Sequence, residues 1–449
     1  MFLCISSKIK IDLNLIKQII VTIVKNLSGE DSKIAIIGLG YVGLPLAVEF
    51  SKKYKTIGFD LNKRRIDQLK KGLDITNEVE KKNILNKKLF FTTQESEISK
   101  CNTFIVTVPT PIKKNKKPDL KFLKQASKIV GRNLKEGSIV IYESTVYPGV
   151  TEDICVPIVE KVSGLKVNIN FYCGYSPERI NPGDKEHRIV NIKKVTSGST
   201  EASALYVDKL YKSIIKAGTF KAKDIKTAEA AKVIENTQRD INIALVNEFS
   251  MVFNKIGLDT QSILEAAETK WNFLPFKPGL VGGHCIGVDP YYLAYKSIKS
   301  GHTPEMILSG RKINDHMSKF ISEEIFNLMR HKNISLKEAK VLIMGFAFKE
   351  NCPDYRNTKI YDLYNYLFKK VLKVDIYDPL IDIKDAKKSY DANFIIKVPK
   401  KFYDTIIIAV PHSIFIDFGK NNFEEYLKKN HIIYDLKNLF NNPKNFYRL

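Results

Sequence analysis

Short apolar runs alternate with amphipathic segments in two separate stretches of the chain. The first stretch predicts strands at 34–37, 56–60, 104–108 and 138–142, and the second predicts strands at 341–345, 374–379 and 405–410. Strands that alternate with helices are typical of parallel sheets covered by helices. We therefore predict an α/β chain with two Rossmann-like, doubly wound parallel-sheet domains.

Between the two stretches, residues 224–256 predict one long helix that joins the domains. Apolar residues recur there at spacings of three, four or seven, without Gly or Pro, at Ala230, Ile234, Ile241, Leu245, Phe249, Val252 and Ile256. At about 3.6 residues per turn the helix makes roughly nine turns, and it could also supply a dimer face. The predicted division is an extension at 1–30, a first α/β domain at 31–222, a helical and dimerisation region at 223–328, and a second α/β domain at 329–449.

Composition narrows the class of partner. The net charge of +23 would suit nucleic acid or an anionic membrane. However, only 10 of the 72 basic residues are Arg, and the Lys are spread along the whole chain. Three of the few Arg, at 179, 239 and 356, fall inside the motifs described below. We therefore expect an anionic small molecule as ligand, with no nucleic-acid and no membrane partner.

The cysteines and the N-terminus bear on the compartment. The six Cys form no CxxC pair and no disulfide framework, so a reducing cytoplasm is the simplest location, and no metal site is predicted. No apolar run reaches the roughly 18 residues that span a bilayer. Apolar residues at 11–24 are mixed with Lys, Asp and Asn, unlike a signal peptide, so the role of residues 1–30 stays open.

A glycine fingerprint stands between the first strand and the first helix. It reads Gly38-Leu39-Gly40-Tyr41-Val42-Gly43. Glycines in this context allow a tight turn and the close approach of a pyrophosphate to the helix N-terminus. Asp60 lies 20 residues beyond Gly40, where a carboxylate can bind both ribose hydroxyls and repel a 2′-phosphate. NAD is therefore the expected cofactor, although Arg65 keeps NADP open.

Polar residues at strand ends and on the long helix add candidate ligand contacts. Thr110, Glu143 and Thr145 follow predicted strands and are expected near the nicotinamide. Lys232, Asn236 and Arg239 lie on one stripe of the long helix and suit an anionic, oxygen-rich ligand, unless the stripe is merely solvated. Two cations in the loop after strand 341–345, Lys349 and Arg356, suit phosphates.

A cysteine lies in a glycine-rich turn that begins at Gly282. The turn reads Gly282-Gly283-His284-Cys285-Ile286-Gly287-Val288-Asp289-Pro290. Beside a nicotinamide, a thiol can bind an aldehyde covalently. Loss of a second hydride then converts this adduct to a thioester, and water hydrolyses the thioester to an acid. Two alternatives remain: a two-electron dehydrogenase in which Cys285 is only a buried residue, and a ligand-binding regulator that has kept the fold and lost turnover.

With these motifs the chain resembles the UDP-glucose/GDP-mannose dehydrogenase family from about Lys33 to the C-terminus. Within it the chain is most similar to the UDP-N-acetylglucosamine 6-dehydrogenases of Vi-type capsular polysaccharide synthesis. The residues that carry the resemblance are Val108–Ile112, Tyr142–Gly149, Gly174–Asp184, Ala228–Arg239, the cysteine turn and Phe348–Asp354.

The resemblance implies roles for residues of this chain. Cys285 would attack the C6 aldehyde, and Lys232 would stabilise the oxyanion with help from Asn236. Glu178 would do acid/base work in thioester hydrolysis, with Thr145 and Asp289 holding the water. The implied substrate contacts are Glu178, Arg179, Ile180, Lys232, Asn236, Arg239, Gly282, Lys349 and Arg356. The implied cofactor contacts are Gly38, Gly40, Tyr41, Val42, Gly43, Asp60, Arg65, Thr110 and Thr145.

The resemblance also implies a homodimer or larger homo-oligomer and a substrate class. The stretch 270–276 resembles the N-acetylhexosamine enzymes, which makes UDP-GlcNAc the first choice over UDP-GalNAc, UDP-ManNAc and UDP-glucose. The product would be a uronic acid for surface polysaccharide, capsule or O-antigen. Trp271 in that stretch could pack on an acetamido methyl group or belong to the core.

Overall fold

The computed structural model describes residues 33–76, 78–180, 188–420, 423–440 and 446–449. The extension predicted at 1–30, and the part of one family motif at 181–184, lie outside these residues. The chain forms two compact units. The first runs to Lys232 without residues 112–117, and the second comprises Ile112–Lys117 and Val233–Leu449.

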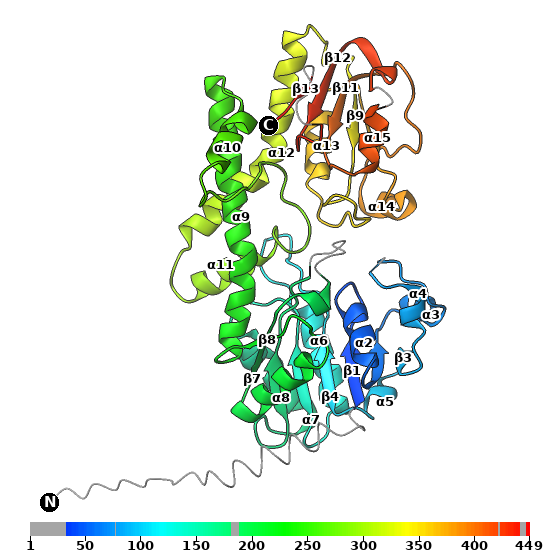
Figure 1. The fold of residues 1–449 in the computed structure, drawn as a ribbon, viewed down its shortest axis with the longest axis vertical. Coiled ribbons are helices and arrows are strands. Elements are labelled where there is room, and N and C mark those ends of the chain that lie inside the picture. The colour runs from blue at the N-terminus through cyan, green and yellow to red at the C-terminus, as the bar shows by residue number, and fades with distance from the viewer. Residues whose placement is uncertain (1–32, 77, 181–187, 421–422, 441–445) are drawn as a thin grey trace, which may run out of the picture. The chain divides into compact units, whose positions relative to one another are not determined.

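The first unit is built on an eight-stranded sheet of order β3-β2-β1-β4-β5-β6-β7-β8 (Figure 1). The strands are β1 Lys33–Ile37, β2 Lys55–Phe59, β3 Leu89–Thr92, β4 Thr103–Val106, β5 Ile139–Tyr142, β6 Tyr172–Tyr175, β7 Lys194–Gly198 and β8 Thr219–Lys221. Only the β6–β7 pair is antiparallel among the described strands. The described residues between these two strands form just the short turn Ile189–Asn191, and an antiparallel neighbour needs no helical crossover. The predicted parallel sheet is confirmed, with this one junction added.

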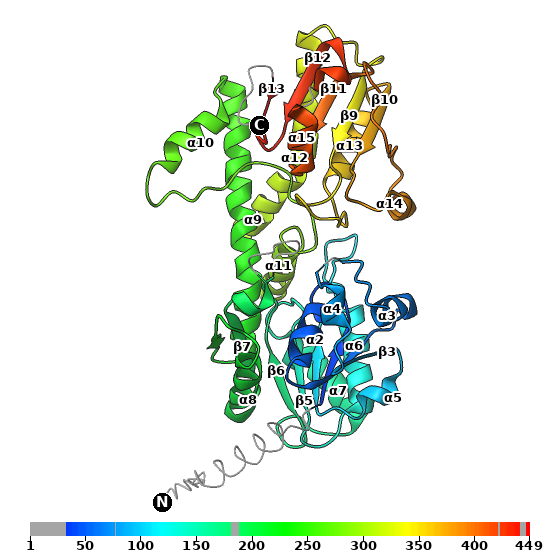
Figure 2. The ribbon, with the colours of Figure 1, turned by 45° about the vertical axis from the view of Figure 1, so that its right-hand side comes forward.

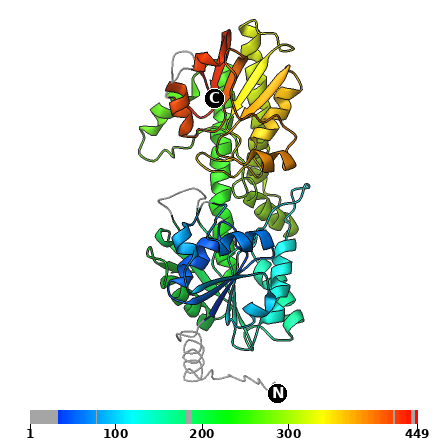
Figure 3. The ribbon, with the colours of Figure 1, turned by 90° about the vertical axis from the view of Figure 1, so that its right-hand side faces the viewer.

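Helices cover both faces of the first sheet, as Figure 3 shows for the blue and cyan strands. They are α2 Gly43–Ser51, α3 Lys63–Lys70, α4 Lys81–Ile84, α5 Glu95–Ile98, α6 Lys121–Asn133, α7 Val156–Ser163 and α8 Glu201–Lys212, with a π-turn at Thr151–Cys155. One core joins Ile34, Ile105 and Ile141 of the strands to α2 and α8. On the other face, Ser127 of α6 hydrogen-bonds Tyr142 of β5 at 2.9 Å. The strand order reverses between β1 and β4, which is where such sheets bind ligands.

The predicted long helix is confirmed as α9, Ile225–Ile256. The division between the two units falls within it, after Lys232. Its apolar residues lie on two faces. Val233, Ala244 and Val246 are buried, whereas Ile234, Leu245, Val252 and Ile256 are exposed.

The second unit carries a five-stranded parallel sheet of order β10-β9-β11-β12-β13 (Figure 2). Its strands are β9 Lys340–Met344, β10 Lys373–Tyr377, β11 Tyr403–Ile408, β12 Leu427–Asp435 and β13 Phe446–Tyr447. Its α-helices besides α9 are α10 Thr260–Glu268, α11 Asp289–Lys299, α12 Glu305–His331, α13 Ile360–Phe368, α14 Ile383–Ser389 and α15 Ile414–Lys420. One core packs α12 and α13 on Val341 and Ile343, and a second packs Phe415 and Phe423 on Leu342 and Met344. Alternate residues of β9 thus face opposite cores, as a strand buried on both faces requires.

No helix in the described part of the chain is both long enough and apolar enough to cross a membrane.

Candidate active site

The glycine fingerprint forms the turn between β1 and α2, and each glycine has its own reason. Gly38 has φ +97°, a left-handed conformation that favours glycine. A Cβ on Gly43 would lie 1.9 Å from the Gly38 carbonyl oxygen, so only glycine lets the helix start there. A Cβ on Gly40 would meet no described protein atom within 4 Å, so this backbone is open to a ligand. Tyr41 and Val42 lead from the open position into α2. The turn therefore fits the pyrophosphate of a dinucleotide.

Asp60 follows β2 and reaches the fingerprint. Its carboxylate accepts hydrogen bonds from the backbone N–H of Leu39 and of Asn62, both at 2.8 Å. Arg65 is buried: its Nε donates to the Leu39 carbonyl at 2.9 Å, and Nη2 lies 2.9 Å from Asp74. Its Nη1 has no hydrogen-bond partner within the described residues. Both predicted side chains thus meet at the second residue of the fingerprint.

Polar residues after β4 and β5 are joined to each other. Thr110 Oγ1 donates to the Thr145 carbonyl at 2.7 Å, and Ser144 Oγ donates to the Val108 carbonyl at 2.6 Å. The loop beyond Thr145 is held by Glu229 of α9, which accepts the Gly149 and Thr151 N–H groups at 2.5 and 2.9 Å. Burial raises the pKa of Glu229 to about 7, although these hydrogen bonds oppose the shift. Thr110 and Thr145 thus lie side by side after the carboxyl ends of β4 and β5, and their place beside the nicotinamide stays a prediction.

Glu178 follows β6 and belongs to a buried charge cluster. Its Oε1 accepts the N–H groups of Arg179 and Ile180 at 2.6 and 2.7 Å, and its Oε2 lies 2.9 Å from Lys194 Nζ. Lys194 also lies 2.7 Å from Glu143, and Glu143 accepts a hydrogen bond from Tyr211. Burial alone would raise the pKa of Glu178, but the Lys194 ammonium and the two amides outweigh burial and lower it.

In the second unit Asn236, Asp289 and Cys285 lie together. Asn236 Nδ2 of α9 donates to Asp289 Oδ2 at 2.5 Å. The Asp289 and Val288 N–H groups donate to the Cys285 carbonyl at 2.8 and 3.0 Å. Cys285 is half-buried and lies four residues before the first residue of α11.

The cysteine turn packs on the loop that carries Lys349 and Arg356. A Cβ on Gly282 would lie 2.9 Å from the Asn357 carbonyl, and Gly283 has φ +80° against the Phe348 ring. His284 Nε2 lies 3.2 Å from Asp354, which also pairs with Arg356 at 2.6 Å. Burial alone would raise the pKa of Asp354, but the hydrogen bonds from His284 and Arg356 outweigh burial and lower it. Ion pairs thus join the two loops, and the glycines allow their backbones to approach closely.

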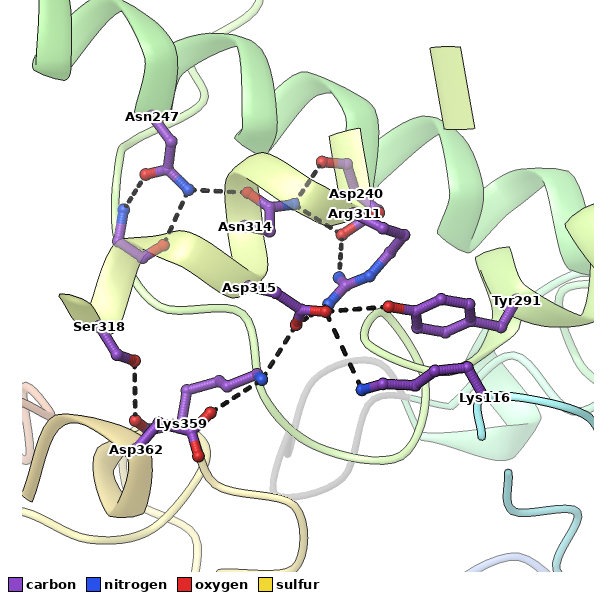
Figure 4. A network of polar contacts seen from close by, with 11 residues as sticks. Lys116, Asp240, Asn247, Tyr291, Arg311, Asn314, Asp315, Ser318, Lys359 and Asp362 are labelled. Atoms are coloured by element: carbon purple, nitrogen blue, oxygen red, sulfur yellow. Dashed lines mark hydrogen bonds and ion pairs between the residues drawn. The ribbon is translucent and has the colours of Figure 1, made fainter. Parts of the chain in front are cut away.

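A polar network joins α9, α12 and the start of α13 in the second unit (Figure 4). Arg311 of α12 pairs with Asp240 of α9 and with Asp315, each at 2.6 Å. Asn247 of α9 accepts the Gly279 N–H at 2.7 Å and donates to the Gly279 carbonyl at 3.0 Å, so the approach to the cysteine turn is fixed to α9. Burial alone would raise the pKa of Asp315, but Arg311 and Lys359 outweigh it and lower the pKa to about 2. Lys359 links the network to the start of α13.

The remaining predicted residues divide by exposure. Lys232 is buried and lies one helical turn before Asn236, so this stripe is not a purely solvated one. Arg239 is exposed, and Lys349 is half-buried. Trp271 is 92% exposed, so the alternative that it belongs to the core of this chain is wrong.

Three further residues at the site were not predicted: Lys194, Tyr211 and Glu229. The partners of Lys194 are 51 and 16 residues away in sequence, so no local spacing marks them. One signal was available, namely a lysine that opens the short strand β7, otherwise made of Val, Thr, Ser and Gly.

Sequence comparison matches most of the chain to one family. Models of the UDP-glucose/GDP-mannose dehydrogenase family match in chain order: the NAD binding domain at 32–215, the central domain at 226–316 and the UDP binding domain at 342–442.

Individual relatives are similar over nearly the whole chain. A UDP-N-acetyl-D-glucosamine 6-dehydrogenase of Pseudomonas aeruginosa is 54% identical over 94% of this chain and 100% of its own length. A protein of the same name from Salmonella typhi is 54% identical over 91% of this chain and 96% of its own length. The solved structure of a UDP-D-ManNAc dehydrogenase from Pyrococcus horikoshii matches with a TM-score of 0.83 at 30% identity, over 93% of this chain and 98% of that one.

Proposed function

Because the chain belongs to the UDP-glucose/GDP-mannose dehydrogenase family, we propose that it oxidises UDP-GlcNAc at C6 to the uronic acid. The chain is an NAD-dependent oxidoreductase, and its fingerprint turn fits that cofactor. The observation that carries the proposal is the contact set of Asn236, Asp289 and Cys285, which fixes the backbone of a half-buried cysteine in the turn before α11.

The choice of sugar rests on the relatives. The two that are 54% identical are named for UDP-N-acetyl-D-glucosamine, whereas two relatives named for UDP-N-acetyl-D-mannosamine are 32% and 33% identical. UDP-GalNAc, UDP-ManNAc and UDP-glucose are the alternative substrates. The product would serve the synthesis of a surface polysaccharide such as capsule or O-antigen.

The proposed mechanism has two successive oxidations at C6, and Cys285 takes part in the second. Bound NAD would supply the hydride acceptor for each oxidation. The Cys285 thiolate attacks the C6 aldehyde, and the Lys232 ammonium with the Asn236 amide stabilises the oxyanion. Glu178 then accepts a proton from the water that hydrolyses the thioester, with Thr145 and Asp289 orienting that water.

We propose five of the predicted residues as substrate contacts. Arg179, Ile180 and Arg239 would bind the sugar nucleotide, and Lys349 with Arg356 would bind its phosphates, because guanidinium and ammonium groups suit phosphate oxygens. Tyr41, Asp60 and Arg65 would hold the adenosine side of NAD. The three family matches support the division into an NAD-binding domain at 31–222, a catalytic helical region at 223–328 and a UDP-binding domain at 329–449.

The proposal predicts the yield of NADH. With limiting UDP-GlcNAc and excess NAD, absorbance should show about two NADH per sugar, together with a uronic acid product. One NADH per sugar would contradict the thioester route. Turnover only with UDP-GalNAc, UDP-ManNAc or UDP-glucose would keep the mechanism and replace the substrate.

We also propose that the chain forms a homodimer through α9. Ile234, Leu245, Val252 and Ile256 are each 47–62% exposed and follow one stripe of the helix. Burying such a stripe against a second copy would remove apolar area from water.

We also propose a cytoplasmic location for the protein, because a reducing compartment keeps the thiol that the mechanism needs in its reduced form.

The dimer predicts the effect of one charge. Leu245→Glu should weaken self-association by at least about 2 kcal/mol, roughly 30-fold in Kd, because a carboxylate would be buried without a partner. Sedimentation velocity over a concentration series measures this. Lys255→Glu places the same side chain on α9 beside the stripe and should leave association unchanged. A monomeric wild-type chain, or equal Kd values for all three, would contradict the dimer.

A further inference from the structure

The proposed mechanism uses Glu178 but gives no role to the lysine that holds it. The Lys194 side chain is 2% exposed and opens β7. The ionisable groups that face it come from three elements: Glu143 after β5, Glu178 after β6 and Tyr211 of α8. Its ammonium lies between the two carboxylates, 2.7 Å from Glu143 and 2.9 Å from Glu178. Burying charged groups this completely costs desolvation free energy, so we asked what function this ion pair serves.

The contacts of Glu178 fix both of its carboxylate oxygens. Oε1 accepts two backbone N–H groups from the segment that follows it, and Oε2 accepts the Lys194 ammonium. Three donors therefore select one orientation of the carboxylate and favour its charged form. Lys194 is the one donor of the three that a side-chain substitution can remove.

Glu143 balances the charge on the other side of Lys194. Two carboxylates and one ammonium leave one net negative charge in a buried place, which favours a proton on one carboxylate. Burial raises the pKa of Glu143 to about 7, although Lys194 opposes the shift. The Tyr211 hydroxyl adds a hydrogen bond to Glu143. Glu143 thus carries the proton at lower pH, and Glu178 stays ionised.

We infer that Lys194 is a positioning residue for thioester hydrolysis, which holds Glu178 ionised and oriented as the base, and that Glu143 supplies the second half of its ion pair. The inference rests on the proposed function. In the step concerned, the water oxygen bonds to the thioester carbon and one water proton passes to Glu178. The carbon–sulfur bond then breaks, Cys285 leaves as a thiolate that can take up that proton, and the carboxylic acid is released.

Lys194→Met should slow hydrolysis selectively. Without the ammonium, burial raises the pKa of Glu178, so the base is protonated at pH values where the wild-type carboxylate is charged. We expect hydrolysis to fall about 10²-fold, the size of a general-base contribution, and its acid limb to move up by about one pH unit or more. Rapid mixing should show the NADH made before hydrolysis as a burst, and mass spectrometry should show the sugar nucleotide bound at Cys285.

Matched variants separate this role from a merely structural one. Lys194→Met combined with Glu143→Gln removes the unpaired carboxylate and keeps the test valid if the single variant fails to fold. Lys194→Arg should restore part of the hydrolysis rate. Glu143→Gln alone keeps the Lys194–Glu178 pair, so it should not accumulate the Cys285 adduct, and its acid limb should not move up.

The outcomes distinguish the inference from the function on which it rests. Adduct accumulation in the Lys194→Met variants, with rescue by Lys194→Arg, supports the positioning role. Wild-type hydrolysis rates and an unchanged acid limb in a folded Lys194→Met/Glu143→Gln chain overturn it while leaving the proposed function intact. A wild-type chain that makes no NADH from any of the four UDP-sugars overturns the function itself.

Discussion

The Cys285→Ala variant is expected to lose uronic acid formation by at least about 10³-fold, which corresponds to about 4 kcal/mol of transition-state stabilisation. The thiol is the only group in the proposed mechanism that can form the thioester, so the second oxidation has no substrate without it. The first oxidation can still proceed to the aldehyde. The variant should therefore release at most about one NADH per sugar.

Acid formation is measured by mass spectrometry of the product, and NADH by absorbance. Cys101→Ala is the matched control, because it also deletes one thiol. Cys101 is buried, and burial raises its pKa to about 12, so it holds no reactive thiolate. Acid formation at the wild-type rate by Cys285→Ala would show that Cys285 is a packing residue and that the thiol mechanism is wrong.

Replacing either of two fingerprint glycines by alanine should weaken NAD binding, but only one replacement should also lower stability. Gly43→Ala places a methyl group 1.9 Å from the Gly38 carbonyl oxygen and 2.4 Å from Thr107 Oγ1, so the turn must shift. We expect it to lower the free energy of unfolding by about 3 kcal/mol and to abolish NAD binding. Gly40→Ala meets no described protein atom within 4 Å, so stability should be unchanged. NAD affinity should still fall about 10-fold to 100-fold, because the methyl group occupies the path of the pyrophosphate.

Thermal unfolding without cofactor and calorimetric titration with NAD measure the two effects separately. Each variant is the control for the other, since both add one methyl group to the same turn. NAD binding by Gly40→Ala at wild-type affinity would show that the pyrophosphate does not approach this backbone. Wild-type stability of Gly43→Ala would show that the close contact with Gly38 is relieved at little cost.

The predictions of the first strand, the fingerprint turn and the long helix were confirmed because the sequence signals for these elements are local. The strand before Gly38, the turn itself and Asp60 lie within 30 residues, and periodicity alone located α9 to within one residue at its start. The antiparallel β6–β7 junction was not predicted, since strand direction depends on a connection rather than on the strand's own residues. The sequence also did not predict which apolar residues of α9 are buried and which are exposed, because the spacing of apolar residues does not say what packs against them.

By itself the sequence determined the fold class, the cofactor and the cysteine turn, because each is encoded in contiguous residues whose backbone or periodicity admits few alternatives. The tertiary structure decided how the charges of the site are arranged. Lys194 meets Glu143 and Glu178 across 51 and 16 residues, and Asn236 meets Asp289 across 53. Contacts of this kind depend on which strands are neighbours and on what is buried between them. Burial raises the pKa of Glu143, whereas Lys194 and two backbone amides lower that of Glu178 despite its burial, so the difference between the two carboxylates exists only in the folded chain.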